Sequence, residues 1–177
     1  AIIRHLNEAD PADLAVMLKS LTFPDAIVAS DAMPLTWSGP VPDPMTWPLP
    51  GTVFTHPRTA GTFSRALRLL AADAGRPVGS GGPLGLVETL RRSSLLPAQL
   101  LAPRVPAMRR KGRVQAGCDA DLVVFDPATV TDRATYSRTT RPSAGISHVL
   151  VNGTFVVRDA EIVTAALPGQ PIRATPR

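Results

Sequence analysis

The chain has 177 residues, of which 44% are hydrophobic, and this apolar content supports a folded core and excludes disorder along most of its length. The net charge of +5 comes mostly from scattered arginines. A single tyrosine argues against a nucleic-acid stacking surface, and no run reaches the about 18 apolar residues that cross a bilayer. One cysteine, Cys118, excludes an internal disulfide framework or cysteine-based zinc cluster and fits a reducing compartment. Together these features predict a cytoplasmic protein without nucleic-acid or membrane partners.

The start of the chain predicts a helix followed by a buried strand. Leucines and a methionine recur at helical spacing over residues 7–21, where Asp10 suits the N-cap and Pro11 the first helical position. Residues 26–30 are almost wholly apolar and lie between turn-forming residues. This pattern is typical of a strand buried on both faces, as in a parallel sheet or α/β barrel. A carboxylate, Asp31, stands at its C-terminal end.

The middle of the chain predicts a long loop and then helices. Residues 32–59 are rich in proline, glycine and threonine and have no period, so they are expected to form an ordered loop. Apolar side chains at helical spacing then predict a helix over 63–70, with Gly75 as its C-cap. After a glycine-rich turn over 76–83, the sequence predicts helices at residues 84–95 and 97–101.

Beyond Lys111 the pattern becomes that of antiparallel β structure. We expect a strand and turn at 112–117, a strand at 121–126, and a meander of strands at 148–151, 154–157 and 161–163. Asn152-Gly153 is typical of a two-residue type I′ turn between the first two strands of the meander. Asp159-Ala160 suits the next turn less well, because alanine disfavours positive φ.

Three segments, in order, resemble the D-aminoacylase (N-acyl-D-amino-acid deacylase) branch of the metal-dependent amidohydrolases. They are Ala29-Ser30-Asp31-Ala32, the Thr-His-Pro-Arg-Thr-Ala-Gly-Thr-Phe run of residues 55–63, and residues 110–127 with their Lys-Gly and Ala-Asp-Leu-Val-Val patterns. Thr46-Trp47-Pro48-Leu49-Pro50 is more similar to the N-acyl-D-glutamate deacylases within that branch. The resemblance covers almost the whole chain.

Asp31 is the candidate catalytic residue. The active sites of TIM-barrel enzymes lie at the C-terminal ends of the strands, so a carboxylate there is typical of catalysis. Metal-assisted amide hydrolysis needs a base for the attacking water and an acid for the leaving amine, and one carboxylate can serve both steps. The resemblance implies this role for Asp31, beside the metal and as a candidate metal ligand. The alternative is that Asp31 only caps a turn.

Arg58, His56 and Ser30 are the candidate substrate-binding residues. The guanidinium of Arg58 can make two parallel hydrogen bonds to a carboxylate, and every N-acyl amino acid carries one. A structural ion pair is the alternative for Arg58. For His56 the alternatives to substrate binding are that it shapes its loop or has a direct catalytic or metal role. Ser30 belongs to the Ser-Asp pair that characterises the family.

The resemblance also implies a fold and a metal. Residues 1–103 would be the last strands and helices of a TIM (β/α)8 barrel, and residues 104–177 part of a small antiparallel β-sandwich. The metal would be zinc. Its main ligands, including a His-x-His motif, are expected upstream of Ala1, because His5, His56 and His148 lie too far apart to form that motif. Cys118 does not match the cysteine that binds metal in the family.

Two functions therefore remain open at this stage. In the first, the chain is part of an intact enzyme that hydrolyses N-acyl-D-amino acids, N-acyl-D-glutamate among them, to a carboxylate and a free D-amino acid. Its partners would be that small substrate and the missing N-terminal barrel region. In the second, the chain is a truncated, inactive fragment or a non-catalytic β module, because most of the metal ligands lie outside it.

Overall fold

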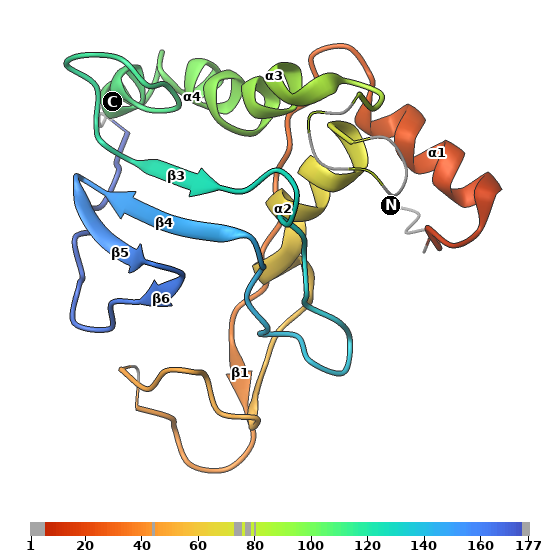
Figure 1. Cartoon of the computed structure of the whole chain (residues 1–177). Helices are drawn as coiled ribbons and strands as arrows, with labels where there is room; N and C mark the ends of the chain where they lie inside the picture. The colour runs from red at the N-terminus through yellow and green to blue at the C-terminus, as the bar shows by residue number, and fades with distance from the viewer. Residues whose placement is uncertain (1–5, 44, 73–75, 77–78, 80, 175–177) are drawn as a thin grey trace.

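Helices and one short strand pair make up the first part of the chain, and a four-stranded antiparallel sheet the second, in a computed structural model that describes residues 6–43, 45–72, 76, 79 and 81–174. The helices are α1 (Pro11–Leu21), α2 (Arg58–Leu70), α3 (Gly85–Leu90), a π-helical turn (Arg91–Leu95), α4 (Leu96–Leu101) and a 3₁₀ turn (Pro106–Arg110). The strands are β1 (Thr36–Trp37), β2 (Val53–Phe54), β3 (Leu122–Phe125), β4 (Ile146–Val151), β5 (Thr154–Arg158) and β6 (Glu161–Ile162). Figure 1 shows α3 and α4 along one edge of the sheet of β3 to β6, with α1 pointing away from it.

The first helix confirms the prediction from its capping residues. The side chain of Asp10 accepts hydrogen bonds from the backbone N–H groups of Ala12 at 2.8 Å and Asp13 at 3.3 Å. Pro11 occupies the first helical position, where its missing N–H costs no hydrogen bond. The helix therefore begins at residue 11, four positions later than its apolar spacing indicated.

The predicted strand at residues 26–30 is wrong. Its backbone pairs with no other strand among the residues that the structure describes. Val28 is buried, but Ile27 is 38% exposed and Ala29 is exposed, so only one face of the segment is covered. An apolar run indicates burial on both faces only where a neighbouring ladder exists. Here Val28 N donates to the carbonyl of Arg92 at 3.0 Å, and Ala26 N donates to the nearby carbonyl of Phe23 at 3.1 Å.

The long loop at residues 32–59 is confirmed over most of its length, with one addition. β1 and β2 pair antiparallel within it, with Thr36 opposite Phe54 and Trp37 opposite Val53. Helix α2 then begins at Arg58, earlier than its apolar residues predicted, because Pro57 fits a helix start. The predicted C-cap at Gly75 lies outside the described residues.

One nearly continuous helical segment replaces the two helices expected at 84–95 and 97–101. It runs from Gly85 to Leu101 through the π-helical turn. Pro97 does not end it, although a proline inside a helix lacks an N–H donor and its ring clashes with the carbonyl four residues back. The wider π turn immediately before Pro97 accommodates that clash.

The sheet confirms the predicted strand at 121–126 and the meander. Its order is β3-β4-β5-β6, and all neighbours are antiparallel. Asn152 and Gly153 have φ of 48° and 76°, which are the two positive angles of a type I′ turn. Asp159 and Ala160 also have positive φ, of 53° and 65°, so the alanine at this turn adopts the conformation it disfavours.

The strand predicted at residues 112–117 is absent from the described structure, and the segment forms turns. Lys111 explains this difference. Its ammonium contacts Asp119 at 3.0 Å and Asp121 at 2.5 Å, which folds residues 112–118 back as a loop between the two ends. Gly112 has φ of 75° and packs so tightly against the backbone of Ser94 that no side chain fits there.

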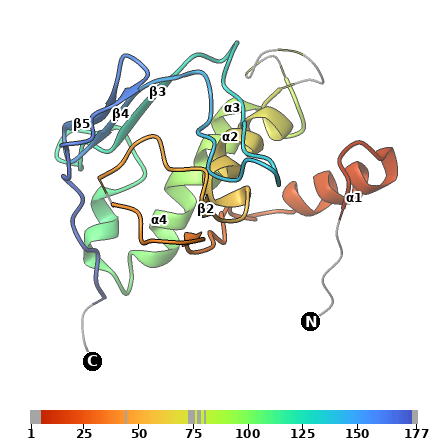
Figure 2. The same ribbon diagram turned by 90° about the horizontal axis from the view of Figure 1, so that it is seen from below.

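Helix α2 lies between α1 and the sheet, as Figure 2 shows from below, and it carries buried residues of both core clusters. On one side, Ala66 and Leu70 pack with Val28, Leu18 and Leu21. On the other, the cluster comprises Leu67, Ala71, Ala72 and Val130, with Leu86, Phe125 and Ile146 packed against it. The architecture is thus mixed helix and antiparallel sheet, with α2 connecting the two parts.

Substitution of Gly145 with alanine is expected to destabilise the fold more than the same change at Gly117. Both glycines have positive φ, of 76° and 80°, so the backbone strain is matched. A Cβ at Gly145 would meet the backbone of Thr129 and Val130, whereas nothing lies within 4 Å at Gly117. Overpacking typically costs about 1–3 kcal/mol, so urea unfolding should show a loss larger by that amount for Gly145→Ala. Equal losses for the two variants would contradict the packing described for Gly145.

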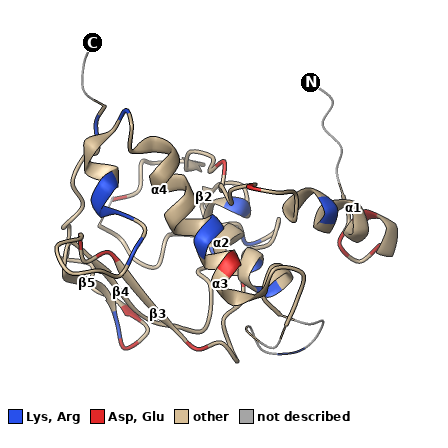
Figure 3. Cartoon of the chain, turned by 90° about the horizontal axis from the view of Figure 1, so that it is seen from above, with Lys and Arg blue, Asp and Glu red and all other residues tan. Residues whose placement is uncertain are grey.

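Charged residues of both signs are distributed over several elements rather than along one. Figure 3 shows Lys and Arg on helices and loops, with Asp and Glu among them.

In the described part of the chain, every helix is too short or too polar to span a bilayer.

An ion-pair cluster joins Glu8, before α1, to α2 and to the loop after β3. Glu8 contacts Arg65 at 2.6 Å and Arg68 at 3.1 Å, and Arg68 also reaches Asp132 at 3.3 Å. Partial burial raises the pKa of the Glu8 carboxyl, but hydrogen bonds and charge attraction from Arg65 and Arg68 outweigh it, so its pKa lies below the usual 4.5. The cluster therefore favours ionised Glu8.

The contribution of Glu8 to stability should depend on pH. Because the folded state lowers the pKa of Glu8, the stabilisation is complete above the unfolded value near 4.5 and is lost as pH falls through the lowered folded value. Since the three side chains are partly exposed, we expect Glu8→Gln to cost about 1 kcal/mol at pH 7. Urea unfolding of both proteins should show this difference at pH 7 and none well below the folded pKa. A difference that persists in acid would contradict the ionic origin.

Candidate functional site

Asp31 and Arg58, predicted from separate motifs, contact each other directly. Arg58 Nη2 lies 2.9 Å from Asp31 Oδ2, and Arg58 Nε donates a hydrogen bond to the backbone carbonyl of Asp31 at 2.6 Å. The Asp31 side chain is 86% exposed, and that of Arg58 is 35% exposed. Asp31 has φ of 46°, a conformation that aspartate tolerates better than most residues. Arg58 thus fixes both the backbone and the carboxylate of an otherwise open residue.

Two threonines hold the loop after Asp31 against the start of α2. Thr55 Oγ1 donates to the carbonyl of Met33 at 3.0 Å, and Met33 N donates to Thr59 Oγ1 at 3.0 Å. The two hydroxyls are 2.9 Å apart, so they form a connected network. Sequence analysis missed this network, although both threonines flank the His-Pro-Arg motif. It joins residues separated by more than 20 positions, which no local pattern indicates.

His56 is engaged at both ring nitrogens. Its Nδ1 accepts a hydrogen bond from Arg58 N at 3.2 Å, and its Nε2 lies 3.4 Å from the hydroxyl of Tyr136. Because Nδ1 accepts, a neutral ring carries its proton on Nε2 and donates it toward Tyr136. The two rings also make an edge contact at 5.3 Å between centroids. His56 therefore accepts the N–H of the first residue of α2, beside the Asp31–Arg58 pair.

Ser30 and Tyr136 complete the residues around this pair. Ser30 is half-buried and directly precedes Asp31, while Tyr136 is 78% exposed and approaches from the loop between β3 and β4. Sequence analysis assigned no role to Tyr136. Its position follows from the packing of that loop on α2, where Ser143 Oγ donates to the carbonyl of Ala60 at 3.3 Å.

A smaller and a larger cavity lie near these residues, and the smaller one is next to the Asp31–Arg58 pair along the chain. It has a volume of about 370 Å³ and is mostly apolar, and its walls include Met33, His56, Pro57 and Tyr136. Asp31 and Arg58 are absent from its lining, but Met33 and Pro57 bring it next to them along the chain.

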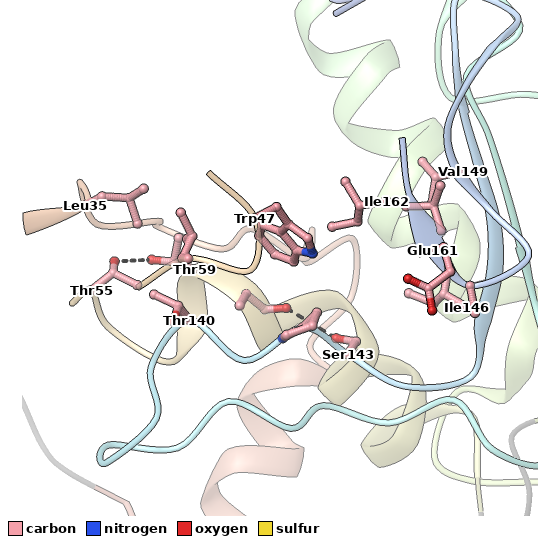
Figure 4. A pocket seen from close by; sticks show the side chains of 15 residues that line it. Leu35, Trp47, Thr55, Thr59, Thr140, Ser143, Ile146, Val149, Glu161 and Ile162 are labelled. Carbon is pink, nitrogen blue, oxygen red and sulfur yellow. Dashed lines mark hydrogen bonds between the residues drawn. The ribbon is translucent and has the colours of Figure 1, made fainter. Parts of the chain in front are cut away.

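The larger cavity, of about 530 Å³, lies between the β1–β2 loop, the start of α2 and the sheet. Figure 4 shows the indole of Trp47 within it, between Thr59 on one side and Ile162 on the other. Its lining contains one carboxylate, Glu161, and no lysine or arginine. The negative charge of Glu161 is unfavourable for binding the carboxylate of an N-acyl amino acid, so the larger volume of this cavity does not make it the better candidate site.

No family model matches the sequence, but individual proteins do. The chain is 42% identical over 112 residues to an N-acyl-D-glutamate deacylase of Alcaligenes xylosoxydans xylosoxydans, and the matched region is 63% of this chain and 20% of that protein. It is 41% identical over 110 residues to a D-aminoacylase of the same organism, covering 61% of this chain and 20% of that protein.

Solved structures agree with these sequence matches. A crystal structure of D-aminoacylase, described as defining a novel subset of amidohydrolases, matches 87% of this chain and 26% of its own, with 32% identity and a TM-score of 0.61. The N-acyl-D-glutamate deacylase of Bordetella bronchiseptica matches with 29% identity and a TM-score of 0.58, over 88% of this chain and 28% of its own. The chain is related to the D-aminoacylases.

This relationship confirms the resemblance found in the sequence motifs. The match covers only part of those proteins. The chain spans about a fifth of the length of the curated D-aminoacylase relatives, with 20% of each of the first two covered. The activity of a whole D-aminoacylase is therefore a property of more residues than these.

The described residues do not fit a complete metal site of the D-aminoacylase type. Metal chemistry belongs to the relatives, since one structure holds zinc and another was obtained with copper chloride. Catalytic zinc needs about three protein ligands. Among the residues that the structure describes, no group of three His, Cys, Asp or Glu side chains could hold a metal ion. Asp31 pairs with Arg58, His148 packs on Phe155, and His5 lies outside the described residues.

Proposed function

We propose that this chain supplies the proton-transferring carboxylate and the carboxylate-binding arginine of an enzyme that hydrolyses the amide bond of N-acyl-D-amino acids. The observation that carries the proposal is the 2.9 Å contact between Asp31 and Arg58. It unites the Ser-Asp and His-Pro-Arg motifs in a chain related to N-acyl-D-amino-acid deacylases. Asp31 and Arg58 are 27 residues apart in the sequence, so the contact joins two separate motifs.

Asp31 has the exposure that proton transfer requires. Its carboxylate is 86% exposed and can accept a proton from an attacking water, then return it to the leaving amine. Arg58 contacts this carboxylate on one side at 2.9 Å, which orients it.

Arg58 retains the geometry to bind a substrate carboxylate as well. Its Nε and Nη2 atoms contact Asp31, so the edge formed by Nη1 and the outer N–H of Nη2 points elsewhere. A guanidinium carries five donors in a planar fork, and that second edge matches a carboxylate. The N-acyl amino acid would thus lie with its α-carboxylate on Arg58 and its amide near Asp31. His56 would fix the backbone of Arg58, and Ser30 would border the site.

The rest of the proposal assigns the fold and the metal. Residues 1–103 would form the end of a TIM (β/α)8 barrel and residues 104–177 part of a β-sandwich, supported by the change from helices to antiparallel strands. Zinc would be held mainly by residues of the remaining four-fifths of the enzyme, in the cytoplasm. The chain alone would be inactive. The second candidate, a non-catalytic fragment, is favoured by one observation: among the described residues, no three potential ligand side chains are grouped so as to hold a metal ion.

N-acyl-D-glutamate is the substrate we favour within this class, since the corresponding deacylase is 42% identical to the chain. A substrate with an acidic side chain needs a second cation. The linings of these two cavities contain neither lysine nor arginine.

A graft tests the proposal. The matching segment of the Alcaligenes N-acyl-D-glutamate deacylase is replaced with this chain, and turnover of N-acetyl-D-glutamate and neutral N-acetyl-D-amino acids is measured with zinc. We expect turnover by the graft, and none by the 177-residue chain alone or by the host lacking the segment. A folded, zinc-loaded graft that hydrolyses neither substrate would refute the proposal.

A further inference from the structure

The π-helical turn lies against the segment before Asp31, and Arg92 makes hydrogen bonds to the backbone of that segment that join the two. Arg92 is 6% exposed, although it is an arginine. Its Nη1 donates to the carbonyls of Leu21 at 3.2 Å and Phe23 at 2.7 Å, which follow α1. Its own backbone carbonyl accepts the N–H of Val28 at 3.0 Å. Arg92 therefore holds both ends of residues 21–28, three residues before Asp31.

Pro97 explains why the carbonyl of Arg92 is available. In an α-helix it would accept from Leu96 N, but Leu96 N bonds five residues back, to Arg91. In a π-helix it would accept from residue 97, but proline has no N–H. Both helical partners are thus removed, and a buried carbonyl without a partner is costly. Val28 N supplies the missing donor, so the irregular helix and the extended segment satisfy each other.

The side chain of Arg92 is fixed as firmly as its carbonyl. Its Nε donates to Glu88 Oε1 at 2.7 Å, one turn earlier in the same helix. The hydrogen bonds from Arg91 and Arg92 lower the pKa of Glu88 to about 2, so the carboxylate stays ionised at neutral pH. An ionised, oriented acceptor holds the guanidinium in the plane that reaches the carbonyls of Leu21 and Phe23.

We propose that Arg92 is a positioning residue for Asp31: its guanidinium and its π-turn carbonyl fix residues 21–28 and so set where the Asp31 carboxylate stands. Val28 adds an apolar anchor by packing on Ala66 and Leu70 of α2. Arg58, also on α2, then holds Asp31 from the far side. The carboxylate is thus located by two arginines on two helices. This inference rests on the proposed function for its effect on catalysis, but its structural part does not.

The test compares Arg92→Met with a matched control, Arg91→Met. Both variants remove an arginine of the π turn that contacts Glu88, but Arg91 reaches only the side chain of Asp25, at 3.6 Å, and no carbonyl of residues 21–23. In the 177-residue chain, we expect Arg92→Met to speed hydrogen exchange of the Val28 amide by about tenfold or more, because a local opening becomes easier. Arg91→Met should leave it unchanged.

Catalysis in the graft supplies the second readout. A misplacement of about 1 Å can cost about 100-fold in rate, so Arg92→Met should lower kcat by up to that factor with KM nearly constant. Arg92→Lys, which restores one donor, should recover part of the loss. A role confined to stability would change the unfolding midpoint without this split. Unchanged kcat in an active graft whose Val28 amide exchanges faster would overturn the positioning role.

Two further outcomes remain decisive. If the unaltered graft has no turnover, the proposed function fails, whereas the Val28 exchange in the chain still decides the structural claim. If Arg92→Met does not fold, Pro97→Ala replaces it, since it keeps the guanidinium and adds only an N–H that competes for the Arg92 carbonyl. Faster Val28 exchange in Pro97→Ala supports the inference, and exchange equal to that of the unaltered chain overturns it.

Discussion

Replacing Asp31 with asparagine in the graft is expected to lower kcat by about 10²–10⁴-fold, the usual contribution of a general acid–base group. Asparagine keeps the size of the side chain and tolerates the positive φ of 46° at this position. Its carboxamide oxygen can still accept from Arg58. The side chain is 86% exposed, so folding should not depend on its charge. Rates of N-acetyl-D-glutamate hydrolysis, together with thermal unfolding, measure both effects.

A charge-matched control is available in the same loop. Asp43 is exposed and accepts a hydrogen bond from Met45 N at 2.8 Å, so Asp43→Asn removes one negative charge without touching the pair. Its kcat should equal that of the unaltered graft. Bound zinc, measured in each purified protein, separates the two roles considered for Asp31. A proton-transferring Asp31 leaves the zinc content of Asp31→Asn intact, whereas loss of zinc would show that it is a metal ligand. Full activity of Asp31→Asn would refute both roles.

Features governed by local chemistry could be predicted from the sequence. The cap at Asp10 needs only the next few residues, and the turn at Asn152-Gly153 needs only two positive φ angles. The strand over 121–126 and the meander that follows are short runs rich in β-branched residues that end at recognisable turns. In each case the residues that determine the conformation are neighbours in the chain, so a local pattern contains the necessary information.

Features that depend on distant partners could not be predicted. The apolar run at 26–30 indicated a buried strand, but whether a strand forms depends on a neighbouring ladder, and the structure provides Arg92 instead. Pro97 indicated a helix end, yet the π turn keeps the helix going. The start of α2 at Arg58 depends on His56 accepting its N–H, which the apolar periodicity does not record.

The candidate site shows the same division. Asp31 and Arg58 were found individually because each residue type suits its chemistry and lies in a motif. Their direct contact, and the threonines that enforce it, emerged only from the fold. The two alternatives for Arg58 are compatible in the proposal, because the ion pair uses Nε and Nη2 and a guanidinium has further donors.

Substitution of Arg58 with methionine tests whether the outer edge of its guanidinium binds substrate. Hydrogen bonds to charged groups contribute about 1.5–3 kcal/mol, so KM for N-acetyl-D-glutamate in the graft should rise about 10–100-fold. The control is Arg65→Met on the same helix, which loses an ion pair with Glu8 at 2.6 Å but contacts neither Asp31 nor the substrate. KM should stay constant in that variant.

A substrate without its carboxylate separates the two functions of Arg58. An N-acyl-D-amino acid amide offers the same scissile bond but nothing for the outer guanidinium edge to bind. If Arg58 holds the substrate carboxylate, Arg58→Met should raise KM for the acid and leave KM for the amide nearly unchanged. Any loss in kcat that is common to both substrates then measures how much the contact of Arg58 with Asp31 contributes to catalysis. Equal effects on KM for acid and amide would show that Arg58 serves Asp31 alone, and the carboxylate would have to bind elsewhere in the enzyme.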